Sequence, residues 1–344
     1  MSHRITIKPS NHAFTTLGDE TILEAALREG FALPYGCRNG ACGACKGVVL
    51  EGSVDYGDYQ ASALSEHDKQ MGKALFCCAR PQSDIVIEVK EIGAAKDIPI
   101  KTMPCRVQHI ERPSDDVIVM YLKLPANERL QFLSGQYIDI LLKDGKRRSF
   151  SLANAPHDDE YLQLHVRHLA GGQFTDYAFS AMREKDILRF EGPHGSFFLR
   201  EDSDKPMILL ASGTGFAPIK AIVEHALHIG LKRTMILYWG ARTRKDMYLP
   251  ELPQKWQAEH ANFTFYPVLS EPAPDDNWSG RTGYVHEAVL DDFADLSAYQ
   301  VYACGAPAMV EAAHRAFIGE RGLPEDQFFS DAFFVAAATA DKSK

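Results

Sequence analysis

Three cysteines within nine residues constrain this chain more than any other feature. Cys37, Cys42 and Cys45 follow the spacing C-x4-C-x2-C, and the residues between them are small or polar. Small residues let the backbone close around a compact group with its N–H groups pointing at the sulfurs, and this spacing is typical of a plant-type [2Fe-2S] site. The sequence therefore predicts an iron-sulfur cluster. Two adjacent thiols do not readily bind one cluster together, so one of Cys77 and Cys78 is expected to be the fourth ligand, and Cys77 is favoured.

Zinc and disulfides are the alternatives for these cysteines. Zinc sites usually pair C-x2-C with a second pair of Cys or His ligands, whereas the second half of this set offers only adjacent cysteines. A disulfide framework fits less well, since seven cysteines in 344 residues are few and odd in number, and no secretory signal opens the chain. Unpaired cysteines suit a reducing compartment, so we expect a cytoplasmic protein.

Composition limits the possible partners. The chain is 45% hydrophobic and 24% charged, an ordinary globular balance, and no apolar run is long enough to span a bilayer. Its formal net charge of −9 argues against nucleic acid, which requires a basic face. We therefore expect a soluble chain of two or three domains, with neither a nucleic acid nor a membrane as partner.

Residues 1–96 have the pattern of a small mixed sheet around the cysteine loop. Short strands are expected at 3–9 and 12–16, joined by a turn, and further strands at 48–50 and 85–89. Between them, apolar residues at helical spacing from Ile22 to Leu27 predict a helix that ends at Gly30. A small, Pro-containing linker at 93–99 then marks a domain junction.

Residues 97–203 have the pattern of an antiparallel barrel. Alternating apolar strands are expected at 117–122, 135–142, 147–152 and 161–166, with turn residues between them. Arg148 and Phe150 face the same side of one strand, where arginine suits a phosphate and the ring suits a flat heterocycle. Taken alone, this could equally be an ordinary strand with one charged edge residue.

A glycine pair follows the last of these strands. Gly171 and Gly172 precede a short expected helix, with Thr175 as its cap. Such an arrangement exposes backbone N–H groups to an anion, although simple capping of a surface helix would have the same pattern.

Residues 204–334 have the pattern of a parallel sheet, followed by a tail at 335–344. The apolar run 207–211 predicts a strand buried on both faces, and Gly213, Thr214 and Gly215 lead from it into a helix with Pro218 in its first turn. The dinucleotide fingerprint G-x-G-x-x-G fails at its third glycine. Further strands at 234–239, 263–269 and 299–303 place Arg242 and Cys304 at strand ends, where open α/β sheets bind ligands.

Together these segments resemble the ferredoxin reductase superfamily with an N-terminal plant-type [2Fe-2S] domain. Arg148-Ser149-Phe150-Ser151 is similar to that family's flavin motif R-x-Y-[ST], with Phe150 in place of the usual tyrosine. The segment 213–218 has its nicotinamide-domain form G-T-G-x-x-P, and 304–307 has its form C-G-x-P. The resemblance implies a β-grasp ferredoxin-like domain, a flavin-binding barrel and an α/β nicotinamide domain.

The resemblance also implies residue roles. For the cluster, the ligands are Cys37, Cys42, Cys45 and Cys77. Arg148 would meet the FAD phosphate, Phe150 the isoalloxazine face, and Ser151 would donate near flavin N5. The other FAD contacts implied are Ser149, His165, Val166, Arg167, Gly171, Gly172, Gln173 and Thr175. The nicotinamide nucleotide would meet Gly213, Thr214, Gly215, Pro218 and Gly305, with Cys304 beside nicotinamide C4 and Phe333 covering the flavin.

The choice between NADH and NADPH depends on the segment after strand 263–269. Glu271 in that segment would accept a ribose hydroxyl and repel a 2′-phosphate, which favours NADH. Arg242, Arg244 or Arg281 could still reach the same place and favour NADPH.

The implied function is an electron-transfer reductase. NADH delivers two electrons to FAD, the flavin passes them singly to the cluster, and a protein partner receives them. The order of domains matches reductases of oxygenases, while the run 327–333 looks most like CDP-6-deoxy-Δ3,4-glucoseen reductase, so the partner is an iron-sulfur dehydrase or an oxygenase component. A flavin enzyme acting on a small substrate, and a redox sensor or carrier without turnover, are the alternatives of other classes.

Overall fold

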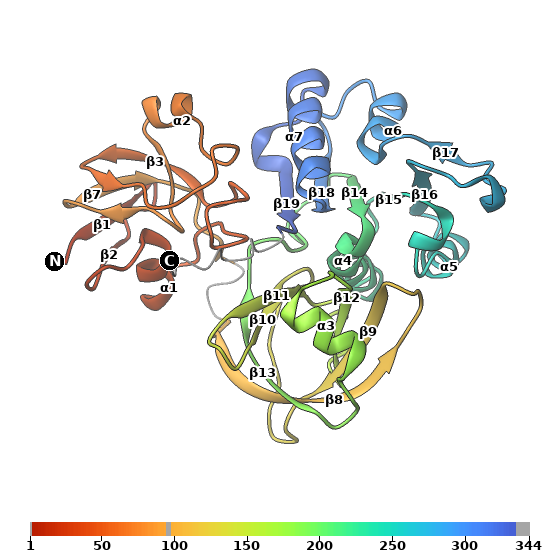
Figure 1. Cartoon of the computed structure of the whole chain (residues 1–344). Coiled ribbons are helices and arrows are strands. Elements are labelled where there is room, and N and C mark those ends of the chain that lie inside the picture. Colours follow the sequence, from red (N-terminus) through yellow and green to blue (C-terminus); the bar gives the residue numbers. More distant parts are fainter. Residues whose placement is uncertain (1, 94–97, 335–344) are drawn as a thin grey trace, which may run out of the picture.

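The computed structural model describes residues 2–93 and 98–334, which form three units, each built on its own sheet (Figure 1). The first unit is red and orange in Figure 1, the second yellow and green, and the third green to blue. The predicted tail at 335–344 and residues 94–97 of the predicted linker lie outside the described residues. Within the described ranges, every helix is too short or too polar to cross a bilayer.

The first unit is a mixed sheet with the strand order β2-β1-β7-β3-β5. Strand β1 runs parallel to β7, and the other neighbours are antiparallel. Its elements are β1 (Arg4–Lys8), β2 (Ala13–Thr15), α1 (Ile22–Arg28), β3 (Lys46–Glu51), β4 (Val54–Asp55), α2 (Glu66–Gln70), β5 (Lys73–Leu75), β6 (Arg80–Pro81) and β7 (Ile85–Glu88). Helix α1 begins where expected, because the Thr21 hydroxyl and the Glu24 carboxylate accept each other's backbone N–H. The expected strands and helix of this unit are confirmed.

The second unit is a six-stranded antiparallel sheet with the order β11-β10-β13-β8-β9-β12. Its elements are β8 (Lys101–Glu111), β9 (Val117–Lys123), β10 (Tyr137–Leu141), β11 (Arg147–Ser151), β12 (Leu162–Arg167), α3 (Gln173–Ser180) and β13 (Ile187–His194). A bridge between Leu152 and Leu164 joins the two edge strands, which closes the sheet into the predicted barrel.

The helix after the glycine pair differs from expectation in its cap. Gly172 is the N-cap of α3, and Thr175 lies in the first turn. The Thr175 hydroxyl donates to the carbonyls of Leu169 and Gly172 and accepts from Leu169 N, so it holds the preceding turn closed instead of capping the helix. The prediction of Thr175 as the cap was therefore wrong, because a threonine three residues into a helix can also bond backward to its own turn.

The third unit is a six-stranded parallel sheet with the order β17-β16-β15-β14-β18-β19. Its strands are β14 (Met207–Ser212), β15 (Met235–Ala241), β16 (Phe263–Leu269), β17 (Arg281–Thr282), β18 (Gln300–Gly305) and β19 (Phe328–Ala332). Its helices are η2 (Gly213–Gly215), α4 (Phe216–His228), η3 (Arg244–Asp246), α5 (Glu251–Glu259), η4 (Pro274–Asp276), α6 (Val285–Asp292), α7 (Pro307–Arg321) and η5 (Glu325–Gln327). Leu209 packs in the core on one face of β14 and Ile208 and Leu210 in the core on the other, which explains the continuous apolar run.

The strand order of this sheet reverses between β14 and β18. The chain moves outward from β14 to β17 on one side and returns to β18 and β19 on the other. The loops that leave β14 and β18 therefore separate at their carboxyl ends, and such a crevice is the usual ligand site of an open α/β sheet. The turn through η2 lies at this point.

The turn at η2 requires glycine at position 215. A Cβ added to Gly215 would lie 2.1 Å from the Cys304 carbonyl oxygen and 2.7 Å from Gly305 N, so the backbone of β18 fills the space that a side chain would need. By contrast, a Cβ added to Gly319 on α7 would meet nothing within 4 Å.

We expect Gly215→Ala to lower the free energy of unfolding by about 1–3 kcal/mol, because the strand backbone must shift to admit the methyl group. Gly319→Ala is the matched control and should stabilise the chain by about 0.5–1 kcal/mol, since alanine is the better residue in a helix. Thermal unfolding of both variants measures the difference. Equal melting temperatures would contradict the role of Gly215.

Candidate cofactor sites

The cysteine loop between α1 and β3 carries Cys37, Cys42 and Cys45, and Cys77, which follows β5, joins them to form two pairs of thiols. Cys37 and Cys42 lie side by side, and so do Cys45 and Cys77. Backbone N–H groups point at the sulfurs, as Cys42 N donates to Cys37 Sγ at 3.3 Å and Cys37 N donates to Cys42 Sγ at 3.4 Å. N–H groups aimed at thiols are the environment that a [2Fe-2S] cluster requires, so these residues fit the predicted cluster.

Two of these thiols have strongly lowered pKa values. The Cys42 thiol and nearby backbone N–H groups lower the pKa of Cys37 to about 6, and the Cys45 and Cys78 thiols lower the pKa of Cys77 to about 3. The Cys77 thiol and burial raise the pKa of Cys78 far above its ordinary value. The Sγ atoms of Cys77 and Cys78 are 3.6 Å apart.

A cavity of about 1500 Å³ lies where the three units meet. The cysteine loop contributes Gly36, Cys37 and Asn39 to its wall, and the barrel and the third unit contribute the remainder. Of the predicted cofactor residues, those lining the cavity are Arg148, Ser149, Phe150, Ser151, His165, Arg167, Gly171, Gly172, Gln173, Thr175, Gly213, Thr214, Arg242, Gly305 and Phe333. Segments far apart in the sequence therefore form one continuous site.

Cations outnumber carboxylates along this wall. The cationic residues are Lys146, Arg147, Arg148, Arg167 and Arg242, against the carboxylates of Asp246 and Asp331. Most of these cations come from the barrel. An excess of arginine suits phosphate groups, so the cavity fits a dinucleotide better than an uncharged ligand.

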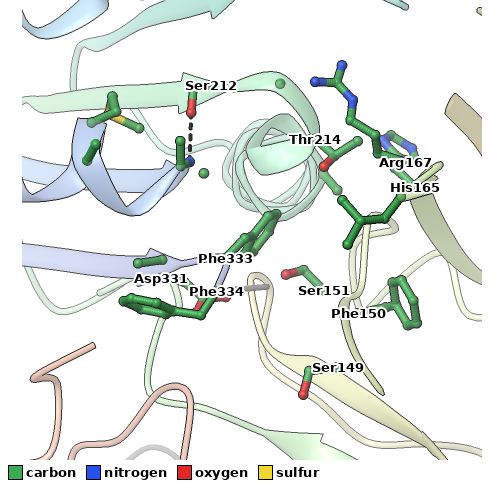
Figure 2. Close-up of a pocket in the computed structure, with 18 of the residues that line it drawn as sticks. Ser149, Phe150, Ser151, His165, Arg167, Ser212, Thr214, Asp331, Phe333 and Phe334 are labelled. Atoms are coloured by element: carbon green, nitrogen blue, oxygen red, sulfur yellow. Dashed lines mark hydrogen bonds between the residues drawn. The ribbon is translucent and has the colours of Figure 1, made fainter. Parts of the chain in front are cut away.

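Strand β11 presents the predicted flavin motif to this cavity. Phe150 is half-buried and its ring centroid lies 5.1 Å from that of Phe174 on α3. The hydroxyl of Ser149 donates to Asp139 on the neighbouring strand β10 at 2.6 Å. Figure 2 shows Ser149, Phe150 and Ser151 on the same side of the cavity, across from the turn that carries Thr214.

Several buried polar atoms in this wall have no hydrogen-bond partner among the residues that the structure describes. They are Ser151 Oγ, His165 Nε2 and Arg167 Nη2, and all three residues line the cavity. A buried polar group without a partner is costly, so these atoms indicate a polar ligand that completes their hydrogen bonds. The positions of all three match the predicted FAD contacts, and the site therefore fits FAD.

His165 is held by a tyrosine from the third unit. The Tyr248 hydroxyl is 2.7 Å from His165 Nδ1, and Tyr248 is itself packed edge-on against Trp239. Burial, with a smaller effect from Lys220, lowers the pKa of His165 well below its ordinary value, and burial raises that of Tyr248. Both side chains are therefore neutral in the folded chain. The sequence gives no signal for the contact between His165 and Tyr248, because it joins residues 83 positions apart.

The loops after β14 and β18 are bonded to each other. Ala306 N donates to Ser212 Oγ at 2.9 Å, the dashed line in Figure 2, and Trp239 Nε1 donates to the Gly213 carbonyl at 3.1 Å. Gly213, Thr214 and Gly305 then face the cavity. This is the expected position for a nicotinamide nucleotide at the carboxyl end of the sheet.

Five predicted site residues lie behind the cavity wall or beside it. Val166, Gly215, Pro218, Cys304 and Glu271 are not among its lining residues. Val166 belongs to the barrel core, Pro218 is buried in the first turn of α4, and Gly215 and Cys304 back against each other. Burial raises the pKa of the Cys304 thiol well above its ordinary value, so this thiol is a poor nucleophile.

Three arginines were considered for the nucleotide ribose, and the structure separates them. Arg281 donates to Asp292 at 2.6 Å, and Arg244 donates to the Asp276 carbonyl at 3.3 Å. Arg242 lines the cavity, with its Nε 3.4 Å from Asp246. The exposed Glu271 donates its backbone N–H to the Arg242 carbonyl.

Sequence reasoning missed Asp331 and Phe334. Asp331 is the penultimate residue of β19, is buried, and lines the cavity together with Phe333 and Phe334, the three lying close to Ser151 in Figure 2. Burial, and then the nearby Cys37 thiol, raise the pKa of Asp331 to about 7. A carboxylate inside the apolar run 328–334 was the available signal, since such a residue is seldom buried without a purpose.

Family models match each of the three units. Residues 5–82 match the 2Fe-2S iron-sulfur cluster binding domain, residues 104–199 the oxidoreductase FAD-binding domain, and residues 209–315 the oxidoreductase NAD-binding domain. The three matches agree with the three predicted cofactors, and the predicted fold class and cofactor set are confirmed.

Similarity to curated proteins extends over almost the whole chain. The CDP-6-deoxy-L-threo-D-glycero-4-hexulose-3-dehydrase reductase of Yersinia pseudotuberculosis serotype I (strain IP32953) is 41% identical over 333 residues, 97% of this chain and 99% of that protein. The chain belongs to the ferredoxin reductase superfamily with an N-terminal [2Fe-2S] domain. It is an NAD(P)H-dependent iron-sulfur flavoprotein reductase.

This iron-sulfur flavoprotein reductase is also similar to a phenol hydroxylase protein and to a cytochrome P450 reductase. The phenol hydroxylase P5 protein of Acinetobacter pittii (strain PHEA-2) is 34% identical over 98% of this chain and 96% of that protein. Among solved structures, the Amycolatopsis cytochrome P450 reductase GcoB has a TM-score of 0.78 at 32% identity and covers 96% of this chain and 98% of its own. The family resemblance inferred from the sequence is thus confirmed.

Acid is expected to weaken the fold of this reductase partly through His165. The folded chain keeps this buried ring neutral, while the unfolded chain takes up a proton below the ordinary pKa of 6.5. His165 therefore does not destabilise the fold above pH 6.5. Below that pH, protonation of the unfolded chain lowers the free energy of unfolding by up to about 1.4 kcal/mol per pH unit.

Melting temperatures between about pH 7.5 and 5 measure this effect, as the window includes the ordinary histidine pKa. His165→Gln should show a shallower decrease with acid than the unmodified chain. His67→Gln, on the exposed surface of α2, is the control and should keep the original slope. Equal slopes for the two variants would contradict the prediction.

Proposed function

We propose that this chain is the NADH-dependent reductase of a CDP-deoxysugar dehydrase system, passing electrons from NADH through FAD and the [2Fe-2S] cluster to an iron-sulfur dehydrase. The observation that carries the proposal is the single cavity, whose wall includes Cys37 of the cysteine loop, Ser151 of the flavin strand and Thr214 of the nicotinamide turn. The 41% identity to a dehydrase reductase supports the choice of partner.

The barrel residues would bind and orient the flavin. Arg148 would neutralise a phosphate, Phe150 would pack against the ring system, and the unpartnered hydroxyl of Ser151 would donate a hydrogen bond near N5. His165 would donate through Nε2, because Tyr248 bonds its other nitrogen. The turn that precedes α3, with Gly171, Gly172, Gln173 and Thr175, and the strand residues Ser149, Val166 and Arg167 would complete the FAD site.

The third unit would bind the nicotinamide nucleotide. Gly213, Thr214, Gly215 and Pro218 open α4, whose N-terminus favours a pyrophosphate, while Gly305 and Cys304 would lie beside the nicotinamide. When bound, FAD takes a hydride from the nicotinamide and releases its electrons singly to the cluster. Phe333 would cover the flavin and exclude water from the site.

We propose NADH as the preferred donor. Of the three arginines weighed above, Arg244 and Arg281 are bonded elsewhere, and Arg242 lies beside the Asp246 carboxylate. A 2′-phosphate would thus meet carboxylates of Asp246 and, from the adjacent loop, Glu271 with only one arginine to offset them. A free ribose hydroxyl, as in NADH, would instead donate a hydrogen bond to these carboxylates.

We further propose Cys37, Cys42, Cys45 and Cys77 as the cluster ligands, since Cys77 lies beside Cys45 while Cys78 is directed towards Gly40. All seven cysteines are unpaired, which supports a reducing cytoplasmic setting. The functional units would be divided near residues 96 and 203, with a tail after 334.

A reductase of an oxygenase is the second candidate. Its support is the similarity, at 34% identity, to the phenol hydroxylase P5 protein over 98% of the chain. The cavity fits both candidates equally. Its residues would bind the nicotinamide and the flavin, through which electrons enter, and not the protein that receives them.

The test is an acceptor comparison with anaerobically purified holoenzyme. NADH or NADPH is added with either a CDP-6-deoxyhexulose dehydrase or a phenol hydroxylase oxygenase component, and nucleotide oxidation and product are followed. We expect NADH to be preferred and the dehydrase to be supported. Turnover with the oxygenase alone would favour the second candidate, and a cluster-containing protein that never oxidises NADH would indicate a redox sensor.

Cys77→Ser and Cys78→Ser form a matched pair for the fourth ligand. Cys77→Ser should lose most of its iron and the visible absorption of the cluster while keeping its flavin, because a structural thiolate ligand is removed. Cys78→Ser should retain iron close to the original content. Iron analysis and the EPR spectrum of the reduced protein measure the cluster content of both variants. Loss of the cluster in Cys78→Ser and its retention in Cys77→Ser would assign Cys78 as the ligand.

A further inference from the structure

The cysteine loop is bonded directly to the flavin barrel. Ser196, just after β13, accepts from Tyr35 N through its Oγ at 3.0 Å, donates from Oγ to the Tyr35 carbonyl at 2.8 Å, and donates its own N–H to that carbonyl at 2.9 Å. The Tyr137 hydroxyl of β10 donates to the Gly36 carbonyl at 2.7 Å. Both bonded residues directly precede Cys37, a predicted cluster ligand.

The next residue after this ligand enters the barrel. Arg38 has a positive φ of 57°, and its guanidinium forms an ion pair with Asp139 of β10, whose side chain is 2% exposed. A second guanidinium, that of Arg147, pairs with Glu191 of β13. His194, fully buried, has its Nδ1 3.4 Å from Arg38 Nη1.

This charged cluster is not a metal site. Ligand-type atoms of Asp139, Glu191 and His194 lie within 4.8 Å of one another, a spacing that a cation could bridge. Arg38 and Arg147 already supply two positive charges for the two carboxylates, which leaves no charge for a metal to neutralise. The cluster is instead an ion-pair network between two units.

Asp139 connects the two predicted cofactor sites. One of its carboxylate oxygens, Oδ2, accepts from Arg38 in the cysteine loop, and the other, Oδ1, accepts from the Ser149 hydroxyl at 2.6 Å. Ser149 is the β11 residue paired with Asp139 across the sheet, and it lies between Arg148 and Phe150 of the flavin motif. A single buried carboxylate therefore joins the cluster loop to the flavin strand.

We propose that Arg38 and Asp139 are positioning residues that clamp the ferredoxin unit onto the flavin barrel and thereby hold the cluster at the flavin edge. The inference rests on the proposed function for the identity of the two cofactor sites, while the clamp itself is a contact between described residues. The Tyr35–Ser196 bonds, the Tyr137–Gly36 bond and the ion pair of Arg38 hold the residues on either side of Cys37, so this ligand is fixed from both sides.

Removing one partner of a buried ion pair is costly because the other charge stays buried without compensation. Loss of Arg38 leaves the Asp139 carboxylate with the Ser149 hydroxyl at 2.6 Å, His194 Nε2 at 3.8 Å and Arg147 at 3.9 Å. The docked arrangement of the two units should then be less populated, while the core of each unit is unchanged. The effect should appear in the step between the two sites and not in the delivery of hydride.

The test compares Arg38→Ala with Arg28→Ala in the holoenzyme. Arg28, on α1 of the same unit, pairs with Glu20 and Glu29 and is 32% exposed, against 26% for Arg38, so it is a matched arginine that makes no contact with the barrel. Stopped-flow absorbance after one equivalent of NADH measures flavin reduction. Freeze-quench EPR measures the appearance of the reduced cluster.

For Arg38→Ala we expect flavin reduction within about twofold of the unmodified rate and cluster reduction at least about tenfold slower, since the docked state loses a buried charge pair. Limited proteolysis between β7 and β8 should be faster and the radius of gyration larger, readouts that do not depend on turnover. Arg28→Ala should match the unmodified protein in every measurement. Unchanged cluster reduction and proteolysis in Arg38→Ala would overturn the proposal.

Ser196→Ala is the second variant, for the case in which Arg38→Ala no longer assembles its cluster. It removes the hydroxyl bridge to Tyr35 at a distance from the thiols, and it should give the same pattern with a smaller amplitude. If it behaves as the unmodified protein in proteolysis and cluster reduction, the clamp is contradicted. Absence of flavin reduction by NADH in the unmodified protein would contradict the proposed function instead, and proteolysis would still decide the clamp.

Discussion

Burial of Asp139 beneath the cysteine loop is the interaction on which the arrangement of the two N-terminal units depends. The carboxylate is almost inaccessible, so it requires cationic and hydroxyl partners, and these come from opposite sides, Arg38 from the cysteine loop and Ser149 from the flavin strand. The Asp139 carboxylate thus joins the first and second units, whose hydrophobic cores are separate. Electron transfer between the units requires that kind of fixed approach.

The third unit meets the other two at its switch point. There the loops after β14 and β18 are in direct contact, as Gly215 packs against the Cys304 backbone and Ser212 accepts from Ala306. The last strand, β19, extends the same sheet, and its penultimate residue, Asp331, lies beside the cysteine loop. The cavity therefore forms where the ends of β14, β18 and β19 meet the cysteine loop and the barrel, so that each of the three units contributes residues to its wall.

Motifs that are local in the sequence could be predicted, and contacts between units could not. The cysteine spacing, the strand from Arg147 to Ser151 and the turn at Gly213 each lie within a few consecutive residues, and each of these segments contributes residues to the cavity wall. Thr175 was assigned to the wrong position because local hydrogen bonding offers a hydroxyl more than one backbone partner. Tyr248 and Asp331 act over long sequence separations, and only folding brings them to the site.

The sequence by itself determined three units and their order, because alternation, glycine turns and cysteine spacing are properties of short segments. Its resemblance to a known family then implied the kind of cofactor that each unit receives. Tertiary structure alone decided which side of each unit faces the others. Arg38 and Asp139 are 101 positions apart, and neither residue has a local signal that names the other. Ion pairing and burial depend on distances in space, and these exist only after the three sheets have packed around their common cavity.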